Sequence, residues 1–530
     1  MINAQIRTLD RDRPTAEAVS WRDGMILAVG STADVLGSSG DLDEVIDLRG
    51  GTLTPGLIDS HIHPILGSQA TRGADMSGRT TIEAVRAGLA KEAAQTPDGQ
   101  WVRAWNLDYR AFADCGVTAD AIESAVAGRP FLGIFYDLHT ALASHAAIDA
   151  SGIADAPPIR DSLAEIVRDS AGRPTGELRE ADSYLAIFQS QAPTDPAEIL
   201  ATFAEVTARF NAVGVTGGVV MDADAETLDL LAAAEANDVL SMRIIAALWH
   251  HPEYGEERIV EIVQQTQRRG RRWESGAVKI YADGVIDTGT AWLREPDSCG
   301  CGARPFWPSP DHLRELIGRY AAAGIALSIH ATGDRATDFV LDAYSSAALP
   351  ANGARHRLEH LELLGDVEVA KLAEVGAIAS MQPLHMQWRQ ADASDSFSKR
   401  LGPARTGHAF RVRDVIDAGV TVCLGSDWPV ASLDPRVGMA WARLRRRPGE
   451  PDAPVFEPDQ RLDGLQALYG YTRWAAAAVG HPEWGVIAPG TPADLAGFAG
   501  DPVQTPADDL VDLPVVLTVV DGQIVHRGQS

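Results

Sequence analysis

Eight short apolar segments, most of them followed by a helical pattern, constrain the fold of this 530-residue chain more than any other feature. They are rich in β-branched residues and cover residues 56–61, 214–222, 241–249, 277–283, 324–330, 356–360, 376–382 and 420–427. Continuous apolar strands that alternate with helices are typical of a parallel sheet with both faces covered. Eight of them in one chain favour an α/β fold of the TIM-like (β/α)8 barrel type over an open sheet.

The two ends of the chain follow a different pattern, in which apolar and polar residues alternate between turn residues. Near the N-terminus, Asp23-Gly24 separates two such segments and predicts a hairpin. The alternation returns near the C-terminus in PVVLTVVDG and QIVHRG. We therefore expect residues 1–55 and 485–530 to form one small β-sandwich beside a barrel of residues 56–484. The stretch from about 67 to 210 is too long for a loop, so we expect an inserted α/β subdomain there.

The charge balance argues against several classes of function. With 46 Lys+Arg against 73 Asp+Glu, the formal net charge is -27, and so acidic a chain is not expected to bind nucleic acid or an anionic membrane. No apolar run approaches the roughly 18 residues of a membrane span. The N-terminus does not resemble a signal peptide, so the expected location is cytoplasmic. The 4 cysteines do not make a disulfide framework, and the composition permits a homodimer without requiring one.

Side chains that can bind metals fall at or near the carboxyl ends of the expected strands. His61 and His63 are two residues apart, so an extended backbone points both imidazoles the same way. Further strands supply Lys279, His330, His360 and Asp427. A lone histidine at a strand end is more often a hydrogen-bonded core residue than a ligand. The carboxyl ends of all barrel strands open onto one face, however, and four histidines with a carboxylate on that face predict a metal site.

Lys279 is the unusual member of this set, because it lies in the apolar segment GAVKIYADG and is expected to be buried. Burial lowers the pKa of an ammonium group. The neutral amine can add CO₂ to form a carbamate, which is an anionic oxygen ligand able to bridge two cations. The alternative is a structural salt bridge to Asp283 on the same strand.

An ordered series of motifs spans nearly the whole chain: EAVSWRDGMILAVG, LTPGLIDSHIHP, GRPTGELRE, AVKIYADG, IHATGDRATD, RHRLEH, SMQPLH, LGSDWPV and WGVIAPGTPADLAGF. This series resembles the amidohydrolase superfamily, and within it the amidohydrolase 3 branch that includes the N-substituted formamide deformylases. The resemblance implies a barrel with a composite β-sandwich built from both termini. It also implies two divalent metal ions, most often zinc.

The resemblance assigns a role to each of these strand residues. It implies that a carboxylated Lys279 bridges two ions and divides the other ligands between them: His61, His63 and Asp427 for one ion, His330 and His360 for the other. The expected reaction is hydrolysis of an amide-like C–N bond, such as that of an N-substituted formamide or an N-acyl compound, by a metal-bridging hydroxide. Asp427 is then the expected general base and, later in the reaction, the general acid.

The substrate is expected to be a small molecule with an apolar or aromatic part, because tryptophans lie at or beyond four strand ends. In family members a residue matching His139 approaches the substrate. The candidate substrate contacts are His139, Trp249, Trp292, His385, Trp388 and Trp428.

Two departures from the family pattern concern substrate loops rather than the metal site. GVTGGVVMD lacks the Ser and His that often follow the second strand, and DGVIDTGTAWLREP lacks the Arg usual before Thr-Ala. Several alternatives therefore stay open: a single-metal deaminase, a lactonase or a carbamate hydrolase of the same superfamily, a one-metal isomerase or hydratase, and a non-catalytic metal-binding protein.

Overall fold

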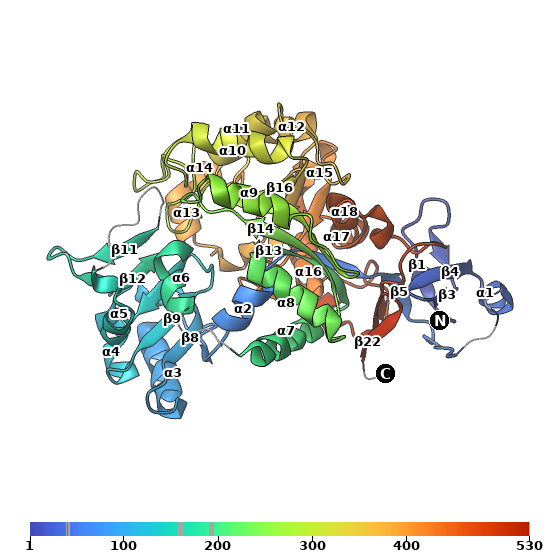
Figure 1. Cartoon of the computed structure of the whole chain (residues 1–530), viewed down its shortest axis with the longest axis horizontal. Helices are drawn as coiled ribbons and strands as arrows, with labels where there is room; N and C mark the ends of the chain where they lie inside the picture. The colour runs from blue at the N-terminus through green and yellow to red at the C-terminus, as the bar shows by residue number, and fades with distance from the viewer. Residues whose placement is uncertain (39, 41–42, 156–163, 190–194, 529–530) are drawn as a thin grey trace.

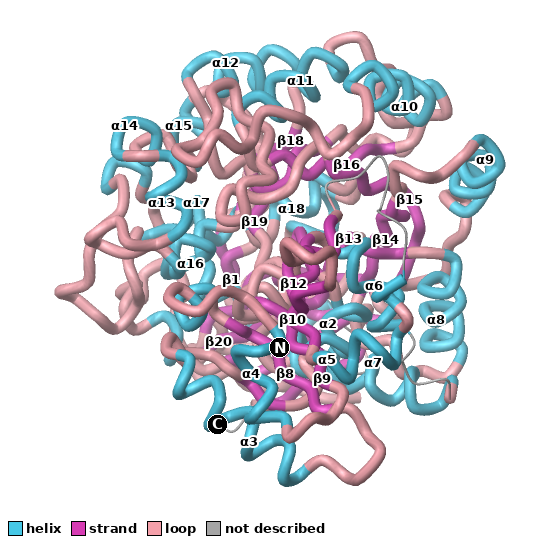
Figure 2. The backbone as a smooth tube through the Cα atoms, turned by 90° about the vertical axis from the view of Figure 1, so that its left-hand side faces the viewer, coloured by secondary structure: helices cyan, strands magenta, loops and turns pink. Residues whose placement is uncertain are grey.

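The centre of the molecule is a sheet of eight parallel strands, seen in Figures 1 and 2. The computed structural model describes residues 1–38, 40, 43–155, 164–189 and 195–528. The strand order is β6-β13-β14-β15-β16-β17-β18-β19. Their bounds are β6 Leu57–Ile62, β13 Val215–Ala223, β14 Arg243–Trp249, β15 Trp273–Tyr281, β16 Ala326–Ala331, β17 Arg357–His360, β18 Ile378–Met381 and β19 Val422–Leu424. Each of the eight apolar segments contains one of these strands or overlaps it, which confirms the predicted TIM-like fold.

Hydrogen bonds between the first and last strands close the sheet towards a barrel. The Asp427 N–H donates to the His61 carbonyl at 2.8 Å, and the His63 N–H donates to the Trp428 carbonyl at 2.8 Å. These bonds extend the pairing just past the ends of β6 and β19. Barrel closure therefore places His61, His63 and Asp427 side by side through the backbone alone.

Helices surround the barrel strands (Figure 2). They include α7 Pro196–Asn211, α8 Ala225–Ala236, α9 Glu256–Gln265, α10 Pro310–Ala322, α11 Asp334–Tyr344, α12 Asp366–Val375, α15 Val412–Asp417, α16 Pro435–Leu444, α17 Gly464–Gly470 and α18 Arg473–Ala478. Helix α10 shows how they pack: Ser309 caps its first turn, and Leu313, Leu316, Ile317 and Tyr320 recur on one buried face. Within the described residues, we find no helix with the length and apolar character needed to cross a bilayer.

An inserted subdomain follows the short helix α2 (Pro64–Ala70) and lies at the left of Figure 1. Its mixed sheet has the order β11-β12-β10-β9-β8-β7. The bounds are β7 Ala74–Asp75, β8 Val102–Leu107, β9 Phe131–Phe135, β10 Thr140–Ala143, β11 Glu165–Arg168 and β12 Pro174–Arg179, with helices α3 Ile82–Gln95, α4 Ala119–Val126, α5 His145–Ser151 and α6 Ala181–Gln189. The range of about 67–210 also includes α7, whose Phe203, Val206 and Phe210 belong to the barrel core.

Strands from both ends of the chain share a third sheet, at the right of Figure 1. Its order is β2-β1-β5-β20-β21-β22, with bounds β1 Gln5–Arg7, β2 Thr15–Ala16, β5 Thr52–Pro55, β20 Leu495–Phe498, β21 Val515–Val520 and β22 Gln523–Arg527. The hairpin of β3 (Ala18–Arg22) and β4 (Met25–Gly30) shares a hydrophobic core with it. Asp23 and Gly24 both have positive φ, 51° and 80°, as a tight two-residue hairpin turn requires.

Candidate metal centre

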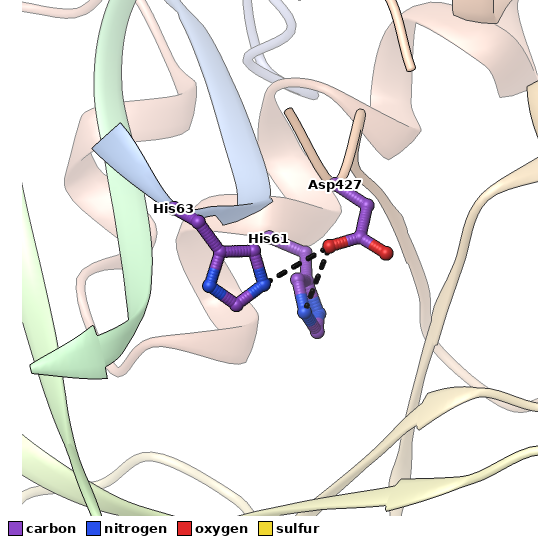
Figure 3. A group of neighbouring side chains, drawn as sticks. All are labelled: His61, His63 and Asp427. Carbon is purple, nitrogen blue, oxygen red and sulfur yellow. Dashed lines mark ion pairs between the residues drawn. The ribbon is translucent and has the colours of Figure 1, made fainter. Parts of the chain in front are cut away.

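Four histidine rings form a continuous buried cluster at the carboxyl end of the barrel. The ring centroids of His61 and His63 are 5.3 Å apart, those of His61 and His360 4.7 Å, and those of His330 and His360 4.4 Å. Asp427 completes the group, with Oδ1 at 3.1 Å from His63 Nε2 and 3.5 Å from His61 Nε2 (Figure 3). The structure thus brings these five predicted ligands together.

Two sets of these side chains have the spacing of a metal site. In each set, one ligand atom per residue lies within 4.8 Å of the others; the sets are His61, His63 and Asp427, and His360, His385 and Asp427. His385 is a predicted substrate contact that lines the cavity here, and its Nε2 lies 3.8 Å from Asp427 Oδ2. Asp427 is therefore shared by two neighbouring groups of possible ligands.

Several buried nitrogens of this cluster have no hydrogen-bond partner in the described part of the chain: His61 Nε2, His63 Nδ1, Lys279 Nζ, His330 Nδ1 and His385 Nε2. Buried polar atoms in folded proteins nearly always have a partner. Imidazole nitrogens together with a carboxylate are the donors that Zn²⁺ and related divalent ions prefer. The residues present therefore fit a divalent metal site.

Lys279 is fully buried, at 0 % exposed, and burial lowers its pKa to about 8. Its Nζ lies 4.9 Å from the centroid of the Tyr281 ring. Asp283 is engaged elsewhere, because its carboxylate accepts backbone N–H bonds from Trp292 at 2.8 Å and Gly333 at 2.9 Å. The described structure thus has no Lys279–Asp283 salt bridge, and the amine stays unpaired among the histidines.

The backbone at two of these residues has an uncommon conformation. His360 has φ 75° and Asp427 has φ 58°, both in the left-handed region that side chains other than glycine rarely adopt. Such conformations concentrate at ligand-binding and catalytic positions, where the surrounding structure holds them. Their presence at the ends of β17 and β19 supports a functional role for this face of the barrel.

Sequence reasoning missed the carboxylates that hold the histidines in place. Glu359 Oε2 lies 2.9 Å from His61 Nδ1, and Arg357 donates to Glu359 Oε1 at 2.9 Å. Although burial opposes it, the Arg357 guanidinium keeps the pKa of Glu359 well below its usual range. Glu359 can therefore orient His61 so that Nε2 faces Asp427. The signal was the Arg-x-Glu spacing within the RLEH segment.

A second missed carboxylate is Asp222, near the end of β13. Its Oδ1 lies 3.4 Å from His63 Nδ1. Asp222 is the last residue of the predicted strand GVTGGVVMD. Its position at a strand end could have identified it as a residue of the metal centre.

Four of the predicted substrate contacts line the cavities that reach this centre: His139, Trp249, His385 and Trp388. His139 Nδ1 lies 2.6 Å from Glu180 Oε2. Burial lowers the pKa of His139, but the Glu180 carboxylate outweighs burial and raises this pKa to about 9. Trp388 stacks on Tyr136 with ring centroids 4.5 Å apart. The insertion and the loop after β18 thus build a shared wall over the metal cluster.

Two other tryptophans lie elsewhere. Trp292 packs on Phe339 of α11 with centroids 5.2 Å apart. The Trp428 ring meets Phe210 of α7 at 5.7 Å and lines an outer cleft of about 440 Å³. This cleft shares Tyr136, Trp388 and Val430 with the cavity at the metal cluster. The structure does not bring either ring into the cavities around the metal cluster.

A parallel eight-stranded barrel with buried histidines and an aspartate at its carboxyl end defines a class of metal-dependent hydrolases. Comparison with known families makes the assignment specific: residues 44–526 match the model described as "Amidohydrolase family". The chain belongs to this family and is a metal-dependent hydrolase of the amidohydrolase superfamily, as the motif series predicted.

Curated relatives align over almost the whole chain. N-substituted formamide deformylase of Arthrobacter pascens is 29% identical over 544 residues, covering 99% of this chain and 98% of its own. Putative amidohydrolase YtcJ of Bacillus subtilis is 28% identical and covers 98% of each chain.

Solved structures share the fold. An uncharacterised metal-dependent hydrolase of Pyrococcus horikoshii superimposes with a TM-score of 0.74 at 20% identity, covering 96% of this chain and 98% of its own. Atrazine chlorohydrolase TrzN of Arthrobacter aurescens, solved with zinc, superimposes with a TM-score of 0.52 at 17% identity, covering 99% and 95%.

Proposed function

We propose that the protein hydrolyses an amide-like C–N bond of a small molecule at a two-metal centre. The ligands are the strand residues His61, His63, His330, His360 and Asp427, with a carboxylated Lys279 as the bridge. The strongest support is that Lys279 Nζ is buried without a hydrogen-bond partner. Nearby histidine nitrogens are also buried without one. A carbamate on that nitrogen would replace an unpaired buried group by a metal ligand.

Each residue has a distinct part in this reaction. Divalent ions bound here would acidify a water molecule and polarise the substrate carbonyl. Asp427 accepts the proton of that water and then donates it to the leaving nitrogen, which is a poor leaving group until it is protonated. His139, held by Glu180 at 2.6 Å, lines the same cavity with its ring centroid 5.7 Å from that of His330, and it is placed to hydrogen-bond the substrate.

The name of one relative, N-substituted formamide deformylase, suggests the first substrates to test. The stacked pair of Trp388 and Tyr136 lines the cavity at the metal cluster and favours an aromatic or apolar substituent. N-benzylformamide and N-aryl acetamides should therefore be hydrolysed faster than polar amino-acid amides.

The test is hydrolysis by the protein reconstituted with zinc or manganese. Formate or acetate should appear from the aromatic amides, and metal removal by a chelator should abolish turnover. Ammonia release from aminated rings, with no amide hydrolysis, would overturn the proposal in favour of a deaminase.

A further inference from the structure

A second, larger cavity lies beside the metal centre, between α2, α6, α7 and α8. Its volume is about 700 Å³, whereas the cavity at the metal centre itself measures about 50 Å³. The two share five lining residues: Leu66, Ala181, Tyr184, Asp222 and Trp249. The large cavity, called here the side cavity, therefore adjoins the site that His63 and Asp427 line.

The walls of the side cavity carry mostly apolar side chains. They come from four helices, with Ile65 on α2, Leu185 and Phe188 on α6, Leu200 on α7 and Leu230 on α8. A cavity of this size and lining falls in the range of pockets that enclose small organic ligands.

Charges on the side cavity work against an anionic occupant. Asp222, Asp224 and Glu226 line it. Its basic side chains in the described structure are Arg258, which pairs with Glu261 at 2.7 Å, and His251, which lies 3.2 Å from Asp182. An incoming carboxylate would therefore meet carboxylates and two basic side chains that already have acidic partners.

We propose that the side cavity binds a neutral apolar substituent of the substrate while the scissile bond lies at the metal cluster. This inference rests on the proposed function, and it adds that the substrate carries an extended aliphatic or arylalkyl group without a terminal carboxylate. The substituent enters past Leu66, Tyr184 and Trp249, which both cavities share. It is carried on the nitrogen or on the carbonyl carbon of the bond that is cleaved.

Two homologous series test this on the metal-loaded enzyme. N-alkylformamides extend the nitrogen side, and N-methylalkanamides extend the carbonyl side. In one of the two, kcat/KM should rise by about fourfold per added methylene until the cavity is filled. A terminal carboxylate on the longest member should lower kcat/KM by at least about tenfold. The inference would be overturned if kcat/KM did not change with chain length in either series. It would also be overturned if the terminal carboxylate left kcat/KM unchanged.

A matched pair of variants locates the effect. Leu230 lines the side cavity from α8, whereas Leu349 is 60% exposed on a loop after α11. In Leu230→Trp, the ratio of kcat/KM for the octyl substrate to kcat/KM for the methyl substrate should fall towards one. In Leu349→Trp the ratio should stay at the wild-type value, and a collapse there as well would contradict the assignment.

Failure of the proposed function can be told apart from failure of this inference. If the metal-loaded enzyme hydrolyses no amide, calorimetric titration with 1-octanol measures the side cavity directly. Wild type should bind 1-octanol at least about tenfold more tightly than Leu230→Trp does. Equal binding by the two proteins would refute the side cavity as an apolar subsite, whatever reaction the enzyme catalyses.

Discussion

The two ends of the barrel bury ionisable side chains in opposite ways. At the amino end, Arg243 pairs with Asp494 and, at 3.1 Å, with Asp521 of the terminal sheet region. Arg272, just before β15, donates to the Leu240 carbonyl at 2.8 Å and to Gln523 at 2.7 Å. These bonds join the barrel to the sheet built from both termini.

At the carboxyl end, three buried nitrogens have no hydrogen-bond partner within the described structure: Lys279 Nζ, His61 Nε2 and His330 Nδ1. A buried polar atom without a partner destabilises the fold. The carboxyl end therefore lowers the stability of the protein, whereas the paired groups at the amino end do not. The difference indicates that the amino end serves folding and the carboxyl end serves binding of a ligand. The variants below test that division, from the largest expected effect to the smallest.

Asp427→Asn should lower kcat by about 1000-fold or more, because the amide cannot accept and return the proton. Metal content, measured by elemental analysis, should be largely retained. Full activity in a correctly metallated variant would show that Asp427 is not the general base and acid.

Asp494→Asn should lower the free energy of unfolding by roughly 1–3 kcal/mol, because it leaves the buried Arg243 with Asp521 as its remaining ionic partner. Urea denaturation measures this loss. The activity of the folded fraction should stay within about twofold of wild type. A variant with unchanged stability would show that the amino end does not depend on this pair.

Lys279→Met should raise the stability of the metal-free protein by about 1–3 kcal/mol at pH 7, since it removes an unpaired buried ammonium group. The pKa of Lys279 is about 8 in the folded state, below its unfolded value, so the penalty is complete below pH 8 and fades as the pH rises towards 10.5. Denaturation in a chelator at both pH values measures it.

Lys371→Met is the matched control, because Lys371 is paired with Asp338 at 2.7 Å. It should not stabilise the protein. A gain in Lys371→Met equal to that in Lys279→Met would show that the effect is not specific to the unpaired amine.

His481→Gln should have the smallest effect and a defined pH dependence. His481 Nε2 lies 2.9 Å from Glu274 on β15; burial opposes this, but Glu274 raises the pKa of His481 above its usual value. The stabilisation is complete below about pH 6.5 and is lost as the pH rises through the raised pKa. Because the pair is partly exposed, the loss at pH 5.5 should be below about 1 kcal/mol and should vanish by pH 9.

Much of the fold could be predicted because each barrel strand has a continuous apolar segment and ends at the same face. From this pattern the sequence predicts that His61, His63 and Asp427 lie together. The direction of side chains beyond the strands could not be predicted in this way. Trp292 and Trp428 both follow strand ends, yet their rings pack on helices α11 and α7, because helix packing rather than strand alternation orients them.

The most direct test of the central claim is the number of metal ions per chain, measured together with the ¹³C spectrum of protein supplied with ¹³C-bicarbonate. The account predicts close to two ions per chain and a carbamate resonance that is absent from Lys279→Met. One ion per chain in a fully active enzyme, with no carbamate resonance, would contradict it.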